Sequence, residues 1–268
     1  NCVAVSDKSP DATLTLQAER DIVVNGNVSI ARTGTNKLNV ILNSDLDGNG
    51  AGAIVMNTGS SINSNGGNIT LGGGTAGDGS DYARGYATAT RYTGALLYGT
   101  TLTAAGGNIS VKGKGNATFT NTNDMRGVDM IGAAISTTGS GNINIDGVGG
   151  NGNVSNTNVG IGMTYASTVT GSSGGTVTLT GTGTNGAYYN FGVWLSGAGS
   201  KVTSAGNVSI TGTAGAATNN FSYNDGIMIQ NGAEVSTTGS GNLTISGTGA
   251  TSSGNYNHGV NIVGASTN

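Results

Sequence analysis

The sequence predicts an all-β protein: a right-handed parallel β-helix, which is a single-stranded solenoid of about eight coils with three short strands in each coil. Two observations lead to this fold class. A repeat of 32 to 34 residues runs along most of the chain, and each repeat holds three short apolar runs separated by small turn residues. A period of this size built from strand-sized runs is typical of solenoid proteins. The right-handed sense follows from the general rule for parallel crossovers.

The first run of each repeat begins directly after a glycine, at Gly94, Gly127, Gly160, Gly192, Gly226 and Gly259. Apolar residues alternate with others in this run, as in a strand with one buried face. Stacked coils place equivalent runs about 4.8 Å apart, so the inward residues should pile into one continuous core. These inward residues are Ala95 and Leu97, Val128 and Met130, Ile161 and Met163, Val193 and Leu195, Ile227 and Ile229, and Val260 and Ile262.

The second and third runs complete the coil. In the repeat from Asp225 to Gly249, the second run centres on Ala233 and Val235, and the third extends from Leu243 to Ile245. Each third run follows a Gly-Asn or Gly-Thr pair, whose second members are Asn68, Asn108, Asn142, Thr176, Asn207 and Asn242. Glycine suits such a corner because it adopts backbone conformations that other residues resist. Asparagine can in addition bond to its equivalent in the next coil.

Composition supports one continuous solenoid over residues 1–268. The chain has 51 Gly and 1 Pro, and only 9% of its residues are charged. Such a composition could indicate disorder, but the regular apolar alternation argues against it. The repeat has no break that would mark a domain boundary. We expect the chain to be a segment of a longer protein, because it begins with Asn1 and ends within a coil.

Charge and hydropathy exclude two classes of partner. The net charge is −3 and the basic residues are scattered, so no nucleic-acid-binding surface is predicted. No run approaches the roughly 20 apolar residues of a membrane-spanning helix, so we expect no membrane insertion. The single cysteine, Cys2, excludes an internal disulfide. An incidental thiol is favoured over pairing between chains.

The first coils resemble a known family. The segments LTLQAERDIVVNGNVS and KLNVILNSDLDGNGAGAIVMNTGSSINSNGGNITLGGG, within Leu14 to Gly74, are similar to the repeats of the filamentous-haemagglutinin family. The later coils follow the same GGNITL-type rhythm more loosely. These large bacterial adhesins are exported by two-partner secretion. The resemblance therefore implies a β-helical shaft, an outer-membrane export partner, a location at the bacterial cell surface, and cell adhesion.

Extra residues gather at one place in the coil, between the third run and the next first run. We call these insertions the loop ridge; they are residues 75–93, 116–126, 150–159, 184–191, 214–225 and 251–258. Aromatic residues among Asn, Asp and Ser could stack on sugar rings. The alternative is that they only pin the loops to the shaft. The candidate ligand-contact residues are Tyr188, Tyr189, Phe191, Trp194, Tyr223 and Tyr256.

The residues that point outward from the first runs vary from coil to coil: Leu96, Asp129, Gly162, Trp194, Met228 and Asn261. Large apolar members of this stripe could mark a contact surface. Coverage by the neighbouring loop ridge is the milder explanation. On the second runs, Lys201 and Glu234 fall in adjacent coils and should form a surface ion pair worth about 0–1 kcal/mol.

A weak calcium candidate is the only cofactor that the sequence suggests. Asp45, Asp47 and Asn49 alternate as in the first half of a calcium loop. The twelfth position is Met56, where a calcium loop of the EF-hand type needs Glu, and no helix flanks the motif. A turn between two strands is therefore the favoured interpretation.

Catalysis is not predicted, although β-helices are also the scaffold of many polysaccharide lyases and hydrolases. Asp124, Arg126 and Asp129 form the best local group, and a solvated loop explains them more simply. His258 is the only histidine, which argues against a catalytic triad and a histidine metal site. Its neighbours predict an exposed corner. Two loop asparagines in Asn-x-Ser/Thr motifs, Asn116 and Asn220, are candidate glycosylation sites.

The function most consistent with these patterns is that of a structural and adhesive shaft segment of a secreted bacterial surface adhesin. Its loop ridge would contact a host, a neighbouring cell or a glycan. One alternative is a carbohydrate-active enzyme, which needs two acids within about 10 Å lining a groove. Another is a self-assembling extracellular filament, in which incomplete end coils with unpaired strands associate end to end.

Overall fold

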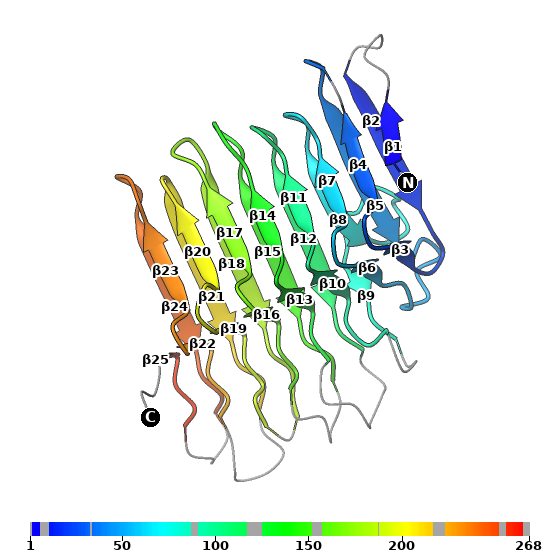
Figure 1. Cartoon of the computed structure of the whole chain (residues 1–268). Helices are drawn as coiled ribbons and strands as arrows, with labels where there is room; N and C mark the ends of the chain where they lie inside the picture. Colours follow the sequence, from blue (N-terminus) through cyan, green and yellow to red (C-terminus); the bar gives the residue numbers. More distant parts are fainter. Residues whose placement is uncertain are drawn as a thin grey trace.

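The computed structural model describes residues 11–32, 34–86, 91–116, 125–151, 157–186, 188–216, 223–251 and 256–264, and the backbone of residues 2–5. These residues form a right-handed parallel β-helix, in which the chain winds around one axis from the N-terminal to the C-terminal end (Figure 1). The described residues contain strands and turns but no helix. The predicted fold class is confirmed.

Each of the three predicted runs forms its own parallel sheet. The first runs form a sheet of β3 (Ile22–Val24), β6 (Ile54–Met56), β10 (Ala95–Tyr98), β13 (Val128–Ile131), β16 (Ile161–Thr164), β19 (Val193–Ser196), β22 (Ile227–Gln230) and β25 (Val260–Val263). The second runs form a sheet of β1 (Cys2–Val5), β4 (Ser29–Arg32), β7 (Ser61–Asn63), β11 (Thr101–Thr103), β14 (Ala134–Ser136), β17 (Thr168–Gly171), β20 (Lys201–Ser204) and β23 (Glu234–Thr237).

The third runs form a sheet of β2 (Ala12–Gln17), β5 (Leu38–Ser44), β8 (Ile69–Gly73), β12 (Ile109–Lys114), β15 (Ile143–Val148), β18 (Thr176–Thr182), β21 (Asn207–Thr213) and β24 (Leu243–Thr248). A short extra strand, β9 (Ala83–Arg84), pairs with the end of β12. The predicted number of about eight coils is slightly too high, because β1, β2 and β25 belong to incomplete coils at the two ends of the described chain.

The predicted register of the first runs is confirmed. Val128 pairs with Ile161, Ile161 pairs with Val193, and Val193 pairs with Ile227. The inward aliphatic residues of all three sheets form one buried cluster that extends through the coils. Val260 and Ile262 also take their expected places, but they are 38% and 68% exposed because no following coil in the described chain covers them.

The Gly-Asn corners make a ladder along the axis. The side-chain oxygen of Asn68 accepts a hydrogen bond from the backbone N–H of Asn108, at 2.9 Å, and Asn108 accepts one from Asn142 at 2.8 Å. The same bond joins Asn39 to Asn68, Asn142 to Thr176, and Asn207 to Asn242. The predicted asparagine bonding between coils is confirmed.

The glycines of these corners are needed for a reason other than the predicted one. A Cβ added to Gly175 would lie 1.9 Å from the carbonyl oxygen of Gly141, and one on Gly107 would lie 2.0 Å from that of Gly67. None of these corner glycines has a positive φ. Close approach of the backbones of adjacent coils, rather than an unusual conformation, therefore excludes a side chain.

A second set of glycines forms a neck at the base of each long loop. A Cβ on Gly147, near the end of β15, would lie 2.1 Å from the carbonyl oxygen of Gly160, which precedes β16. The same approach recurs between Gly181 and Gly192, and at 2.1 Å again between Gly212 and Gly226. Each loop thus leaves and rejoins the coil at one point, outside the aliphatic core.

The surface pair Lys201 and Glu234 forms as expected, at 3.0 Å.

The stacked core predicts a sharp difference between the two faces of one strand. We expect Ile145→Ala, which empties a fully buried position of β15, to lower the free energy of unfolding by about 2–5 kcal/mol. The neighbouring Asn144 is exposed, so Asn144→Ala should change the free energy of unfolding by less than about 0.5 kcal/mol. Urea unfolding followed by circular dichroism would measure both. Equal effects of the two substitutions would contradict the core assignment.

Candidate functional site

A four-residue motif precedes three successive first-sheet strands on the loop ridge. It consists of Tyr, Asn, a variable residue and Gly, and it occurs at 189–192, 223–226 and 256–259, before β19, β22 and β25. The motif is not among the features predicted from the sequence, where these tyrosines count only as residues of the loop ridge. Its three copies are 34 and 33 residues apart, and this regular spacing is the feature of the sequence that could have revealed the motif.

The asparagines of the motif form a second ladder, which is buried. The backbone N–H and the side-chain Nδ2 of Asn190 both donate to Oδ1 of Asn224, at 3.2 and 2.9 Å. Nδ2 of Asn224 donates in turn to Oδ1 of Asn257, at 3.2 Å. Asn190 and Asn224 are fully buried. Hydrogen bonds in such surroundings are costly to lose, so this ladder fixes the position of the residues on either side of it.

The tyrosines of the motif form a stack that follows the axis. The ring centroids of Tyr189 and Tyr223 are 5.7 Å apart with an angle of 10° between the planes, and those of Tyr223 and Tyr256 are 5.0 Å apart at 11°. Tyr189 and Tyr256 have φ values of 53° and 69°, a left-handed conformation that L-residues seldom adopt. The adjacent asparagine ladder holds them in it.

The stack forms one wall of a groove of about 760 Å³. Trp194 of β19, Met228 of β22 and Asn261 of β25 lie in register on the outward side of the first sheet and contribute to the lining. The groove therefore extends over three coils and is bounded by the tyrosine stack and the outer face of the sheet. Among the residues that the structure describes, its lining is Thr157, Tyr189, Phe191, Trp194, Tyr223, Met228, Gln230, Tyr256, His258, Asn261 and Val263.

Residues of the loop ridge cover part of the outward stripe, which supports the milder of the two predicted explanations. Val159, Phe191 and Met228 form a small buried cluster outside the main core, and Trp194 packs against it. The guanidinium of Arg126 lies 4.9 Å from the centre of the Trp194 ring. A cation at this distance over an indole face is attracted to it. Arg126 thus packs against the indole of Trp194, which lines the groove.

The expected solvated loop around Arg126 and Asp129 is wrong. Nη1 of Arg126 lies 2.6 Å from Oδ1 of Asp129, and both residues are buried. The pair lies over Gly162 of the next coil and against Trp194 of the coil after it, contacts that the sequence near the pair does not reveal. Asp124, the third member of the predicted group, lies outside the described residues.

A buried carboxylate lies under the C-terminal end of the groove. Asp225 is fully buried, and Oδ1 accepts from the backbone N–H of His258 at 2.8 Å and faces its Nδ1 at 2.9 Å. Oδ2 accepts from Nδ2 of Asn261 at 3.0 Å. His258 lies on a corner as predicted, with 49% of its side chain exposed, but its inner nitrogen is engaged by this carboxylate.

The structure brings five of the six predicted contact residues into this groove: Tyr189, Phe191, Trp194, Tyr223 and Tyr256. Phe191 is only 4% exposed, so it forms part of the floor of the groove. Tyr188 lies beside Tyr189, with ring centroids 6.4 Å apart, but it does not line the groove. Leu96, from the outward stripe, lines a separate shallow hollow with Tyr98 and Tyr165.

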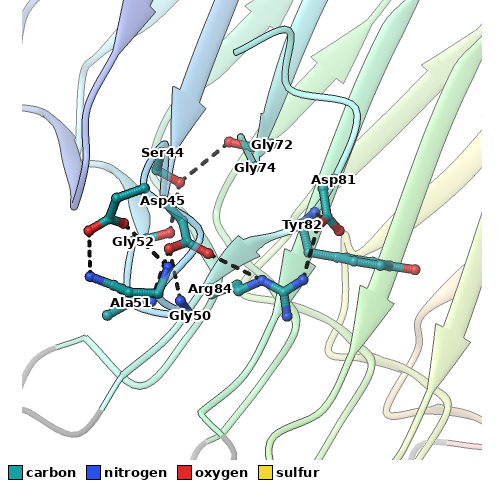
Figure 2. Close-up of polar contacts among 12 residues, drawn as sticks. Ser44, Asp45, Gly50, Ala51, Gly52, Gly72, Gly74, Asp81, Tyr82 and Arg84 are labelled. Carbon is teal, nitrogen blue, oxygen red and sulfur yellow. Dashed lines mark hydrogen bonds and ion pairs between the residues drawn. The ribbon is translucent and has the colours of Figure 1, made fainter. Parts of the chain in front are cut away.

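The calcium candidate forms a turn between β5 and β6. Oδ1 of Asp45 accepts from the backbone N–H groups of Gly50 and Ala51, at 2.9 and 3.2 Å, and its Oδ2 lies 3.2 Å from Nε of Arg84 (Figure 2). Asp47 and Asn49 bond to each other, with Asn49 Nδ2 donating to Asp47 Oδ2 at 2.6 Å. Within the part of the chain that the structure describes, no group of three His, Cys, Asp or Glu residues could hold a metal.

Arg84 joins two carboxylates of different coils. Besides Asp45, its guanidinium contacts Oδ2 of Asp81 at 3.0 Å, and Figure 2 shows it between the two. Burial alone would raise the pKa of Asp81, but the Tyr82 backbone N–H and Arg84 outweigh this and lower it. Neither Asp45 nor Asp81 lines a groove that we describe. These acids are therefore arranged as a structural clamp on the turn.

Of the two glycosylation candidates, only Asn116 is among the described residues. Asn116 is only 3% exposed, so a glycan could be attached there only if the loop base opened. Asn220 lies outside the described residues.

Comparison of the chain with protein-family models, with curated proteins and with solved structures found no match. The resemblance to filamentous-haemagglutinin repeats therefore stays a prediction from the sequence.

We expect Arg84→Met to lower the free energy of unfolding by about 2–4 kcal/mol, because it leaves the buried carboxylate of Asp45 without its cation. Adding Asp45→Asn to this variant should restore part of the loss. Arg20→Met is the exposed control: the Arg20 side chain is 62% exposed, and its contacts with Asp21 and Tyr86 lie at the surface, so its loss should be smaller than that of Arg84. Urea unfolding would compare them, and an equal loss in both single variants would contradict the clamp.

We expect the hydroxyl of Tyr82 to lose its proton at a higher pH than an ordinary tyrosine. Burial, together with the hydrogen bond that its hydroxyl donates to Asp146 at 2.8 Å, raises its pKa from 10.0 to about 12. The folded protein thus binds this proton more tightly than the unfolded chain. Its contribution to stability is complete below pH 10 and is lost as the pH rises to about 12. The difference in phenolate absorbance between the protein and Tyr82→Phe should show this midpoint, and Asp146→Asn should move it down. A midpoint near 10 would contradict the contact.

Proposed function

We propose that the chain is a shaft segment of a secreted bacterial surface adhesin, and that its loop ridge is the face that contacts a host, a neighbouring cell or a glycan. The observation that carries the proposal is the separation of two roles in each coil. The strands have a closely similar sequence in every coil, and they form three continuous parallel sheets around one core. The other side bears long loops of changing sequence that meet in an aromatic groove.

The repeated side supports a mechanical role. Strands of adjacent coils bond to one another in all three sheets, so the hydrogen bonds run along the axis of the solenoid. The asparagine ladder and the close glycine corners add further contacts in the same direction. A segment built in this way keeps the distance and orientation between its ends, as a spacer at a cell surface must.

The variable side supports a contact role. Tyr189, Tyr223 and Tyr256 are each more than 40% exposed, although they are stacked and held by buried ladders. Ordered aromatic side chains lose little conformational entropy on binding, which favours their use in recognition. Export through an outer-membrane partner is implied by the sequence resemblance. The described residues contain no helix suited to span a membrane.

A carbohydrate-active enzyme fits this surface less well. Glycoside hydrolysis generally requires two carboxylates at opposite sides of the scissile bond. No Asp or Glu in the described part of the chain lines the aromatic groove, and Asp225 beneath it is fully buried. The groove is thus better suited to binding than to acid–base chemistry.

End-to-end assembly stays an alternative function. Leu243, Val260, Ile262 and Val263, in the last described strands, are between 38% and 68% exposed. A further coil would cover them, whether it belongs to the same polypeptide or to a second copy. Electron microscopy of the purified chain at increasing concentration distinguishes filaments from single particles.

Beads coated with the chain should adhere to a glycan array or to cells, and Tyr189→Ala/Tyr223→Ala should reduce this adhesion at least about fivefold by dismantling the exposed stack. The matched control is Tyr98→Ala/Tyr165→Ala, which removes two exposed tyrosines outside the aromatic groove. Adhesion that is absent from the unmodified chain, or that both double variants lower equally, would contradict the role of the ridge.

A further inference from the structure

We propose that the aromatic groove binds an uncharged linear polysaccharide that lies parallel to the solenoid axis, with one sugar ring for each coil. This inference rests on the proposed contact function and specifies its ligand. It is carried by three features of the groove: its aromatic and polar lining, its lack of charge, and its repetition along the axis.

The lining suits a pyranose ring. Trp194 and Met228 provide an apolar floor, and the tyrosine stack provides a wall whose ring edges and hydroxyls are left for a ligand because the ring faces stack on one another. A pyranose has an apolar C–H surface and a rim of hydroxyl groups. Gln230 and Asn261, at the end of β22 and on β25, provide amides that can bond to such hydroxyls. The Gln230 side chain has no hydrogen-bond partner within the described part of the chain, so its amide is available.

The charge of the groove disfavours acidic glycans. Among the described residues, no Lys, Arg, Asp or Glu lines the groove, and the carboxylate of Asp225 is buried under its C-terminal end. The cation of Arg126 contacts Trp194 but is already paired with Asp129, so an anionic sugar would approach Asp225 without a lysine or arginine in the described lining to bind it. Repulsion between like charges at short range disfavours such a ligand.

The direction of the ligand follows from the register. Trp194, Met228 and Asn261 succeed one another on paired strands, about 4.8 Å apart, and the tyrosine rings repeat at 5.7 and 5.0 Å beside them. An extended β-1,4-linked chain advances by a similar distance at each sugar. Successive rings can therefore meet equivalent positions of successive coils.

An extended peptide is a poorer occupant. Peptides that bind to a sheet usually add a strand to a free edge. The backbone of β22 at the centre of the groove is already paired on both sides, with β19 and β25. Along β19 and β22 the groove thus presents side chains and no unpaired strand edge, and the edge strand of this sheet in the described chain is β25, at the end of the groove.

The test uses the unmodified chain, because Trp194 is its only tryptophan and lines the groove. Uncharged β-1,4-linked oligosaccharides of glucose or N-acetylglucosamine, from one to five units, are titrated while Trp194 fluorescence is followed, and calorimetry gives the affinities. We expect the affinity to rise about tenfold or more from one to three units and then to level off. Acidic oligosaccharides of equal length should bind at least about tenfold more weakly.

Variants separate the groove from the rest of the surface. Gln230→Ala should weaken trisaccharide binding about threefold to tenfold, by calorimetry, without changing urea unfolding, because Gln230 is outside the core. Trp194→Ala should abolish the binding. Tyr165→Ala, which alters a tyrosine that is 79% exposed elsewhere, should have no effect.

Three results would overturn the proposal: no binding of any uncharged oligosaccharide, a preference for acidic ones or for detergent-like acyl chains, or affinity that does not depend on length. Bead adhesion measured in parallel distinguishes this failure from that of the contact function. If beads still adhere and Trp194→Ala leaves their adhesion unchanged, the groove assignment is wrong while the contact function holds. If beads do not adhere and sugars do not bind, both are wrong.

Discussion

The fold depends on the register of parallel strands between adjacent coils. A strand that bonds to its equivalent one coil away places every side chain directly beside the matching side chain of the next coil, about 4.8 Å distant. Val128, Ile161, Val193 and Ile227 meet in this way. A shift of one residue would turn each aliphatic row toward solvent, so the buried core fixes the register firmly. The two asparagine ladders repeat only because this register holds.

The same register explains where variation is possible. Corner glycines such as Gly141 and Gly175 touch through their backbones, so these positions admit no side chain. At the loop necks, by contrast, the chain leaves and returns beside one pair of glycines, as at Gly147 and Gly160. The loop residues between the two lie outside the aliphatic core. Sequence change is therefore concentrated on one side, where the loops stack into a surface without disturbing the shaft.

Periodicity made most of the fold predictable from the sequence, and it failed where contacts are not periodic. The aliphatic rows, the first asparagine ladder and the gathering of aromatic residues on the loop ridge all follow from equivalent positions. The pair of Arg126 and Asp129 does not, because it is buried against Trp194, two strands further along the sheet. Arg84 forms an ion pair with Asp45, and their separation of 39 residues in the sequence does not match the repeat of 32 to 34 residues. The reason for the corner glycines was also missed, since close backbone approach leaves no pattern distinct from that of a turn.

The tyrosine stack shows how a regular scaffold supports a site of uneven chemistry. Left-handed backbone at Tyr189 and Tyr256 costs on the order of 1 kcal/mol at each residue, and it persists because the neighbouring buried asparagines bond from coil to coil. The wall of the groove is therefore as regular as the shaft. The floor is not: it changes from indole to thioether to amide along the axis, and Asp225 lies under only one end. A ligand that lies along this groove meets the same spacing at every step but different chemistry at each, so the scaffold sets its direction and the floor sets its polarity.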